Sequence, residues 1–228
     1  MDWAKIHWKE DGQPEAPDFD DIYFSHLGGL DESNHVFING NQLRERFKNA
    51  LQFTIIETGF GTGLNFLAAW KLWQEVAPAD STLHFISTEK FPVNPEDLKK
   101  ALSLWSDLTP LADQLLTNYI KLTEESTVKF NKNVKLALHI GDVSSTLPTI
   151  TEKADCWFLD GFTPAKNPEM WQDTLYQDMA KLSHTGTTFA TFTSAGAVRR
   201  GLEAAGFMVR KQKGFAYKKE MISGIFNP

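Results

Sequence analysis

The chain has 228 residues, of which 42% are hydrophobic and 23% charged, and it contains one cysteine. Ordinary globular composition of this kind excludes wholesale disorder, and the length favours one domain with additions over two full domains. A single cysteine excludes an intrachain disulfide and a cysteine zinc cluster, and it is typical of a reducing compartment. No apolar stretch approaches the roughly 18 residues of a membrane span, and the start of the chain lacks the pattern of a secretory signal. We therefore expect a cytoplasmic protein without a membrane partner.

The net charge of −6 is unevenly distributed along the chain. Residues 199–219 hold seven basic residues and one acid, a local charge of +6, so the remainder carries −12. Residues 1–32 alone hold nine acids against two lysines. A basic end on an acidic body is typical of a phosphate-contacting face, but a solvated surface hairpin has the same composition. From charge alone, the solvated surface is slightly favoured.

The N-terminal region, residues 1–50, predicts an arm and a hairpin extension. Residues 1–24 are acidic and contain Gly12, Pro14 and Pro17, which disfavour regular structure, so we expect an irregular arm. Residues 35–47 alternate apolar and polar side chains around Asn39-Gly40, which is the usual signal for a β-hairpin.

The second region, residues 51–228, alternates strand-like and helix-like segments. Compact apolar runs predict strands at 53–57, 83–89, 134–140, 156–160, 187–192, 207–212 and 221–226, the last two as an antiparallel pair. Helical spacing and caps predict helices at 64–76, from the cap Asn94 onward, at 111–122, at 170–182, and from the cap Ser194 to Ala205. This alternation predicts an α/β fold in which helices cover both faces of a mostly parallel, seven-stranded sheet.

In such a sheet, ligands bind beyond the carboxyl ends of the strands, near the topological switch point. The loops after residues 57, 89, 140, 160 and 192 therefore meet at one rim of the sheet. Every motif described next lies on that rim, and this convergence carries more weight than any single motif.

A glycine-rich motif, Glu57-Thr-Gly59-Phe-Gly61-Thr-Gly63, follows the first predicted strand and opens a helix. Alternating glycines allow a tight turn and the close approach of a ligand, and the helix start offers free N–H groups. A dinucleotide fingerprint would have its third glycine where Leu64 stands. Glu57 disfavours a pyrophosphate and favours a cationic ligand such as S-adenosylmethionine. A purely structural glycine turn is the less favoured alternative.

Two further acids follow neighbouring strands. Glu89, thirty residues after Gly59, is placed to accept hydrogen bonds from both hydroxyls of a ribose. Its alternative is a surface carboxylate beside Lys90. Asp142, after Gly141, is placed to accept a hydrogen bond from an adenine amino group. A turn or helix-cap role competes closely, because serines follow it.

Asp160 ends a strand and enters a loop with a glycine, Phe162, two prolines and Lys166. Such a loop is stiff and sets polar groups beside an aromatic face, which suits a flat base or an amine held for reaction. A turn built only for rigidity does not explain why Asp160 and Phe162 both lie on the rim. We therefore expect these two residues at a catalytic centre.

The expected substrate-binding residues are all cations: Lys166, Arg199, Arg200, Lys211 and Lys213. None of the six histidines has ligand spacing with another histidine or with the cysteine, so no metal site is predicted.

Five segments together resemble a known family. They are DFDDIYFS (18–25), ETGFGTGLNFL (57–67), FISTEKFP (85–92), WFLDGFTPAKNPEMW (157–171) and TFTSAGAVRRGLEAAGF (191–207). This set, which runs over nearly the whole chain, is similar to the methyltransferase domain of the MnmC family of bacterial tRNA wobble-uridine modification enzymes.

The resemblance implies a Rossmann-like, class I methyltransferase that uses S-adenosylmethionine. It implies methylation of the 5-aminomethyl group of (2-thio)uridine at the tRNA wobble position, giving 5-methylaminomethyl-(2-thio)uridine. Many members also carry an FAD-dependent oxidase. No second glycine-rich fingerprint follows here, so FAD would belong to a separate domain or a partner, and a stand-alone enzyme and one half of a fusion both fit.

The alternatives are a small-molecule amine methyltransferase or aminopropyltransferase-like enzyme, a non-catalytic nucleotide-binding module, and a nicotinamide oxidoreductase. In the methyl transfer that the resemblance implies, deprotonating an alkylammonium at pH 7 costs roughly 4 to 5 kcal/mol. An ordinary carboxylate is a weak base for that step. We therefore expect Asp160 to orient the amine and Phe162 to form a wall beside it. The aromatic residues Tyr23 and Phe24 of the arm would cover the cofactor or only attach the arm to the core.

Overall fold

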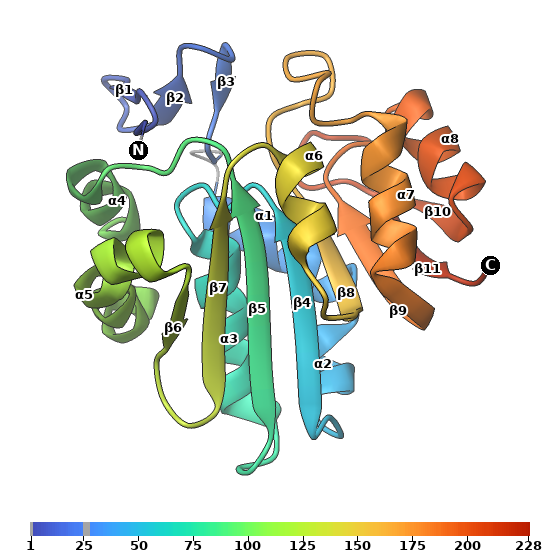
Figure 1. The fold of residues 1–228 in the computed structure, drawn as a ribbon. Coiled ribbons are helices and arrows are strands. Elements are labelled where there is room, and N and C mark those ends of the chain that lie inside the picture. The colour runs from blue at the N-terminus through green and yellow to red at the C-terminus, as the bar shows by residue number, and fades with distance from the viewer. Residues whose placement is uncertain (1, 25–27) are drawn as a thin grey trace.

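A computed structural model describes residues 2–24 and 28–228, so residue 25, the last of the 18–25 segment, lies outside it. In these ranges the centre of the molecule is an eight-stranded sheet of order β10-β11-β9-β8-β4-β5-β7-β6 (Figure 1). Its strands are β4 (Gln52–Thr58), β5 (Thr82–Glu89), β6 (Thr127–Lys129), β7 (Val134–Ile140), β8 (Ala154–Leu159), β9 (Ser183–Thr191), β10 (Phe207–Lys213) and β11 (Glu220–Phe226).

The strand directions confirm the predicted α/β fold. Strands β4, β5, β7, β8 and β9 are parallel, and β10 and β11 form an antiparallel pair beside β9. All seven predicted strands are present. The eighth, β6, pairs antiparallel with β7 at the sheet edge, and its three residues are too few for a periodic pattern.

The switch point of the sheet lies between β4 and β8. From β4 the chain proceeds outward through β5 and β7, and it then returns to place β8 on the other side of β4. The register sets Glu57 beside Phe158 and Thr58 beside Leu159, so the loops after β4 and β8 emerge together. The two strongest motifs of the sequence therefore meet at one point.

Helices cover both faces of the sheet. They are α1 (Gly29–Ser33), α2 (Leu43–Phe47), α3 (Leu64–Val76), α4 (Pro95–Leu102), α5 (Thr109–Glu125), α6 (Val143–Thr146), α7 (Asp173–Lys181) and α8 (Gly196–Ala204). Short 3-10 or π-helical turns, η1 (Asn34–Asn39), η2 (Ser106–Leu108) and η3 (Leu147–Thr149), connect them. No helix of the described ranges is long and apolar enough to cross a membrane.

The strands bury alternate side chains in two separate cores. On β8, Phe158 packs with α3 and α5 on one face, whereas Trp157 packs with α7 and α8 on the other. In Figure 1, α6 and α7 lie on one face of the sheet and α3 on the opposite face. This burial on both faces explains why the predicted strands are continuous apolar runs rather than alternating ones.

The hairpin predicted at residues 35–47 is wrong, because this segment is helical. Val36, Phe37 and Ile38 are all buried, which a strand with one solvent face does not allow. Gly40 lies in the turn between η1 and α2, and its φ of −57° is helical and not that of a hairpin turn glycine. A Cβ at this position would lie 2.1 Å from the Val36 carbonyl oxygen and 2.7 Å from the Ala190 Cβ, so glycine lets this segment pack closely on η1 and on β9.

The N-terminal arm contains three short strands, β1 (His7–Trp8), β2 (Pro14–Ala16) and β3 (Asp21–Ile22), in an antiparallel sheet. This small sheet lies beyond the carboxyl ends of the central strands (Figure 1). Trp8 Nε1 donates a 2.6 Å hydrogen bond to Asp97 Oδ1 and so fixes the arm to α4. The arm is therefore placed to cover the functional rim.

The two predicted helix caps have different outcomes. Asn94 caps α4 as expected, with its side chain accepting hydrogen bonds from two backbone N–H groups. Ser194 is not a cap, since α8 begins at Gly196 and its preceding residue is Ala195. Thr193 instead accepts a 3.2 Å hydrogen bond from the Ala195 N–H.

Candidate active site

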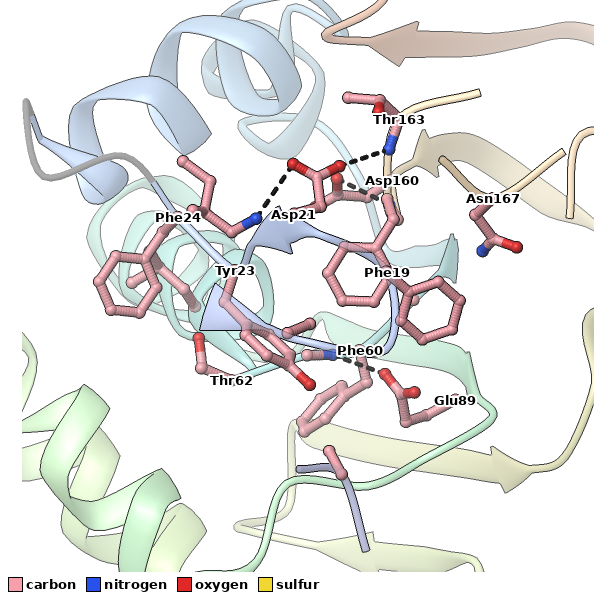
Figure 2. A pocket seen from close by; sticks show the side chains of 18 of the residues that line it. Phe19, Asp21, Tyr23, Phe24, Phe60, Thr62, Glu89, Asp160, Thr163 and Asn167 are labelled. Carbon is pink, nitrogen blue, oxygen red and sulfur yellow. Dashed lines mark hydrogen bonds between the residues drawn. The ribbon is translucent and has the colours of Figure 1, made fainter. Parts of the chain in front are cut away.

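A cavity of about 580 Å³ opens at the carboxyl ends of the central strands, between the arm and the loops after β4, β5, β7 and β8 (Figure 2). Its volume lies in the range of pockets that hold small molecules and cofactors. Six residues expected at the site line it: Gly59, Gly61, Glu89, Asp142, Asp160 and Phe162. The remaining expected residues lie elsewhere on the described chain: Glu57, Gly63, Lys166, Arg199, Arg200, Lys211 and Lys213.

The glycine loop has a conformation that only glycine adopts readily. Gly59, Gly61 and Gly63 have φ values of 78°, 52° and 71°. A Cβ on Gly59 would also lie 3.1 Å from the Gly161 Cα, so the loops after β4 and β8 touch through their backbones. Gly63 is the residue before α3 and does not reach the cavity.

The Glu89 carboxylate lies at the end of β5 and faces the glycine loop. Its Oε2 accepts a 2.9 Å hydrogen bond from the Gly61 N–H, and its Oε1 accepts one of 2.9 Å from the Phe91 N–H. Each carboxylate oxygen has two lone pairs, so capacity remains for ligand hydroxyls. Burial raises the pKa of Glu89, against the opposing effect of these backbone hydrogen bonds.

Asp142 combines a structural contact with a position on the cavity wall. Its Oδ1 accepts hydrogen bonds from the Ser144 N–H at 3.0 Å and the Ser144 hydroxyl at 2.7 Å, which caps α6. Its Oδ2 lies 3.0 Å from Lys90 Nζ. The hydrogen bond from the Ser144 side chain is the main reason that the pKa of Asp142 is lowered. Asp142 is thus a helix cap that also lines the cavity.

A polar network centred on Asn65 forms part of the cavity wall: Ser33, Asn65 and Asp160 line the cavity, and the buried Glu57 and Ser87 lie behind them. The amide Nδ2 of Asn65 donates to Asp160 Oδ2 at 2.7 Å and to Glu57 Oε1 at 2.9 Å. The amide Oδ1 accepts a 2.6 Å hydrogen bond from the Ser33 hydroxyl. Ser87 completes the network by donating to Glu57 Oε2 at 2.7 Å. Glu57 has no exposed surface and is not part of the cavity lining, but Asn65 links it to Asp160.

Sequence reasoning missed Asn65. The sequence did contain a signal for it, because Asn65 is the one polar residue in the otherwise apolar helix segment 64–70. Its position in the first turn of α3 points its amide toward the rim, where the loop after β8 brings Asp160.

The acids of this network have unusual proton affinities. Burial raises the pKa of Glu57 well above its usual range. Burial also raises the pKa of Asp160 to about 6, although hydrogen bonds from the Gly161 N–H and from Asn65 oppose this shift. A cation held near these carboxylates would lower both pKa values. These two carboxylates therefore fit a ligand with a positively charged head.

Aromatic side chains from the arm close one side of the cavity. Phe19 stacks on Phe162 with ring centroids 4.5 Å apart, and Tyr23 meets the edge of Phe162 at 5.5 Å. Figure 2 shows Phe19 and Tyr23 in the same cavity lining as Asp160 and Glu89. Phe24 packs edge-on against Trp105 at 4.8 Å. Tyr23 and Phe24 thus both line the cavity, and Phe24 also attaches the arm to the core.

The expected cations lie outside the cavity, and several are paired with acids. Arg199 pairs with Glu203, Lys211 with Glu220 and Lys166 with Asp20, at 3.2, 2.7 and 3.2 Å. These surface pairs exchange readily with other anions because each contributes little free energy.

Three other lysines, Lys5, Lys90 and Lys218, line the cavity. Lys218, in the loop between β10 and β11, lies 2.7 Å from Glu32 Oε1 and 5.0 Å from the centre of the Phe192 ring. The described residues include no group of three or more histidine, cysteine, aspartate or glutamate side chains that could hold a metal ion.

Residues 106–227 match the model of a family described as S-adenosyl-L-methionine-dependent methyltransferase. The chain belongs to this methyltransferase family. S-adenosylmethionine is its cofactor, as the glycine loop and the acids of the rim predict.

Relatives of this methyltransferase include larger proteins named tRNA 5-methylaminomethyl-2-thiouridine biosynthesis bifunctional protein MnmC. The one from Methylobacillus flagellatus is 50% identical over 98% of this chain and 35% of its own length. The one from Chromobacterium violaceum is 52% identical over 97% of this chain and 34% of its own length. The chain therefore spans about a third of the relatives that it matches.

A solved structure, that of MNMC2 from Aquifex aeolicus, has the same fold. It superposes with a TM-score of 0.75 over 98% of this chain and 70% of its own, at 24% sequence identity. This likeness confirms the predicted Rossmann-like architecture.

Proposed function

We propose that this methyltransferase methylates the 5-aminomethyl group of (2-thio)uridine at the tRNA wobble position, giving 5-methylaminomethyl-(2-thio)uridine. The observation that carries the proposal is the Asp160 carboxylate, which Asn65 and the Gly161 N–H hold at the cavity beside the stacked rings of Phe19 and Phe162. This arrangement suits a flat base that carries an amine. The names of the relatives supply the tRNA and the modified uridine.

The cofactor fits the glycine-loop side of the cavity. When bound, S-adenosylmethionine supplies an electrophilic methyl group on a positively charged sulfur. Gly59 and Gly61 would admit it close to the backbone, Glu89 would accept from its ribose hydroxyls, and Asp142 from its adenine amino group. The network of Glu57 and Asp160 would face its positive charge, with Glu57 acting from behind Asn65.

Asp160 would chiefly orient the substrate amine. A pKa of about 6 leaves this carboxylate mostly ionised at pH 7, so it can accept an N–H hydrogen bond. It is still about 4 units less basic than an alkylamine, so it would not hold the amine's proton for long. The proton would pass to water while Asp160 keeps the nitrogen lone pair aimed at the methyl group. Most of the acceleration would then come from positioning.

The surrounding residues would select the substrate. Phe162 would form the wall against the uracil ring, and residues 1–50 would serve as an accessory arm to a methyltransferase domain of residues 51–228. The cations Lys166, Arg199, Arg200, Lys211 and Lys213 would bind tRNA phosphates outside the cavity.

An FAD-dependent oxidase that makes the aminomethyl group would lie in the part of the relatives that this chain does not match, or in a partner protein. A tRNA substrate and a reduced, buried Cys156 favour the cytoplasm as the site of action.

A methyl-transfer assay with labelled S-adenosylmethionine tests the proposal. We expect transfer to bulk tRNA from cells that lack this protein and no transfer to polyamines. Transfer to polyamines but not to tRNA would contradict the proposal and favour a small-molecule amine methyltransferase.

A further inference from the structure

We infer that Tyr217 is a stacking platform for a second RNA base, the neighbour of the base that is methylated. The inference rests on the proposed function. Tyr217 lies in the loop between β10 and β11, lines the mouth of the cavity and is 76% exposed. An aromatic ring this exposed leaves most of its surface free for a ligand, and it faces the same opening as the reacting group.

The loop that carries Tyr217 is anchored on both sides. Before Tyr217, the Lys213 carbonyl oxygen lies 2.8 Å from His35 Nε2. After it, Lys218 forms its ion pair with Glu32 in α1. Gly214 allows the loop to close tightly, since a Cβ there would lie 2.4 Å from the Lys218 carbonyl oxygen. Tyr217 is therefore exposed although its loop is fixed at both ends.

The backbone adopts an unfavourable conformation to present this ring. Ala216, directly before Tyr217, has a φ of 49°, in the left-handed region that residues with a side chain rarely adopt. Such strained positions persist where surrounding contacts impose them, and they are concentrated at binding sites.

The size of the cavity requires a second base to lie outside it. About 580 Å³ must hold the methyl donor and one base, so a nucleotide that enters leaves its neighbours at the mouth. Proteins that read single-stranded RNA commonly stack such splayed bases on aromatic side chains.

The charges around the loop favour nucleic acid over a protein or an apolar ligand. Lys213, the last residue of β10, and Lys219 lie on either side of Tyr217 in the sequence, and Arg210 lies earlier on β10. None of these three cations has an ion-pair partner among the described residues. They are placed to contact the phosphates on either side of a base stacked on Tyr217, in a way that would depend on salt.

The test uses a synthetic RNA stem-loop with 5-aminomethyluridine in its loop. We expect Tyr217→Ala to raise KM for this RNA about 10-fold, the usual scale for losing one stacked base, with little change in kcat. Tyr217→Phe, which keeps the ring, should behave as wild type. Leu104→Ala is the matched control, because Leu104 is 53% exposed and lies outside the cavity lining.

RNAs with an abasic site on one or the other side of the aminomethyluridine identify the base that stacks on Tyr217. With an abasic site beside the aminomethyluridine, wild type and Tyr217→Ala should have equal KM values. An unchanged KM for Tyr217→Ala, a loss as large for Tyr217→Phe, or a difference that persists on every abasic RNA would overturn the inference.

A binding measurement separates this inference from the proposed function. 2-Aminopurine placed next to the target uridine should lose fluorescence on binding to wild type and to Tyr217→Phe, but not to Tyr217→Ala. Quenching without methyl transfer would contradict the proposed function alone. Methyl transfer without Tyr217-dependent quenching would contradict the stacking platform alone.

Discussion

The two acids bonded to Asn65 and the basic end of the chain differ in how their charges are arranged. Glu57 and Asp160 share one amide donor, Asn65, and burial dominates the pKa of each. The cations of residues 199–219 are spread over α8, β10 and the following loop, and several already pair with surface acids. The acids bonded to Asn65 interact through a few closely spaced atoms, whereas the positive charge of the basic end is distributed over many exposed side chains.

This difference determines how each region should respond to perturbation. Charges in a desolvated network interact strongly and are poorly screened, so a single atom can change the chemistry. Exposed charges are screened over roughly 8 to 10 Å at physiological salt, so each contributes little and all depend on ionic strength. We therefore expect large effects of single substitutions in the network and small, salt-dependent effects at the basic end.

Asp160→Asn should have the largest effect. It removes the negative charge and one acceptor that would orient the amine, so we expect kcat to fall about 10²- to 10³-fold. The affinity for S-adenosylmethionine, measured by calorimetry, should change by only a few fold. Equal losses of turnover and of cofactor affinity would assign Asp160 to cofactor binding instead.

The same substitution should change the pH dependence of stability. Burial raises the pKa of Asp160 from an ordinary 3.8 to about 6, so the folded state holds this proton more tightly than the unfolded state. The resulting stability is complete below pH 3.8 and is lost as the pH rises through about 6. The Asp160→Asn variant has no carboxyl group to titrate at this position, so its stability does not fall in this way. Its free energy of unfolding, relative to wild type, should therefore rise by up to about 3 kcal/mol across that window, at 1.36 kcal/mol per pKa unit.

Chemical denaturation of both proteins between about pH 4 and pH 8 would measure this change. A difference that stays constant with pH would mean that the Asp160 carboxyl titrates normally in the folded protein.

Asn65→Ala should have an intermediate effect. It removes a hydrogen bond that lowers the pKa of Asp160, so that pKa should rise further and the acidic limb of the kcat/KM profile should move to higher pH. We expect kcat to fall about 10- to 100-fold at pH 7 through misplacement of the Asp160 carboxylate. Asn118→Ala is the matched control, since Asn118 is half-buried on α5, lies outside the cavity lining and donates its side-chain hydrogen bond to Gln114 of its own helix. A fall in kcat with an unmoved pH profile would contradict this positioning role.

Charge reversal at the basic end should have the smallest effect at physiological salt. Arg199→Glu combined with Arg200→Glu should weaken tRNA binding several-fold and reduce the slope of log Kd against log salt by about 2, one for each phosphate that is no longer neutralised. Filter binding at several salt concentrations would measure the slope. An unchanged slope would identify this part of the basic end as solvated surface.

Patterns that depend on local chain geometry were predictable from the sequence. Parallel strands buried on both faces gave apolar runs such as 156–159, and the rule that loops at their carboxyl ends meet brought Gly59, Glu89 and Asp160 to one cavity. Asn94 was identifiable as a cap because its signal lies within four residues.

Features that depend on tertiary packing were not predictable. Gly40 has the sequence of a hairpin-turn residue, but a Cβ there would clash with the Val36 carbonyl oxygen and with Ala190, which is 150 residues away along the chain. The separation of Glu57 from the cavity, and the function of Asn65 between Glu57 and Asp160, depend on a side chain from α3 meeting the loop after β8. No local pattern reports such a contact.

Mass spectrometry of tRNA nucleosides from cells that lack this protein tests the proposed methyl transfer most directly. We predict that 5-aminomethyl-(2-thio)uridine accumulates at the wobble position and that 5-methylaminomethyl-(2-thio)uridine disappears. Restoring the wild-type gene, but not the Asp160→Asn variant, should reverse both changes. Normal levels of the methylated nucleoside in the absence of the protein would contradict the proposed function.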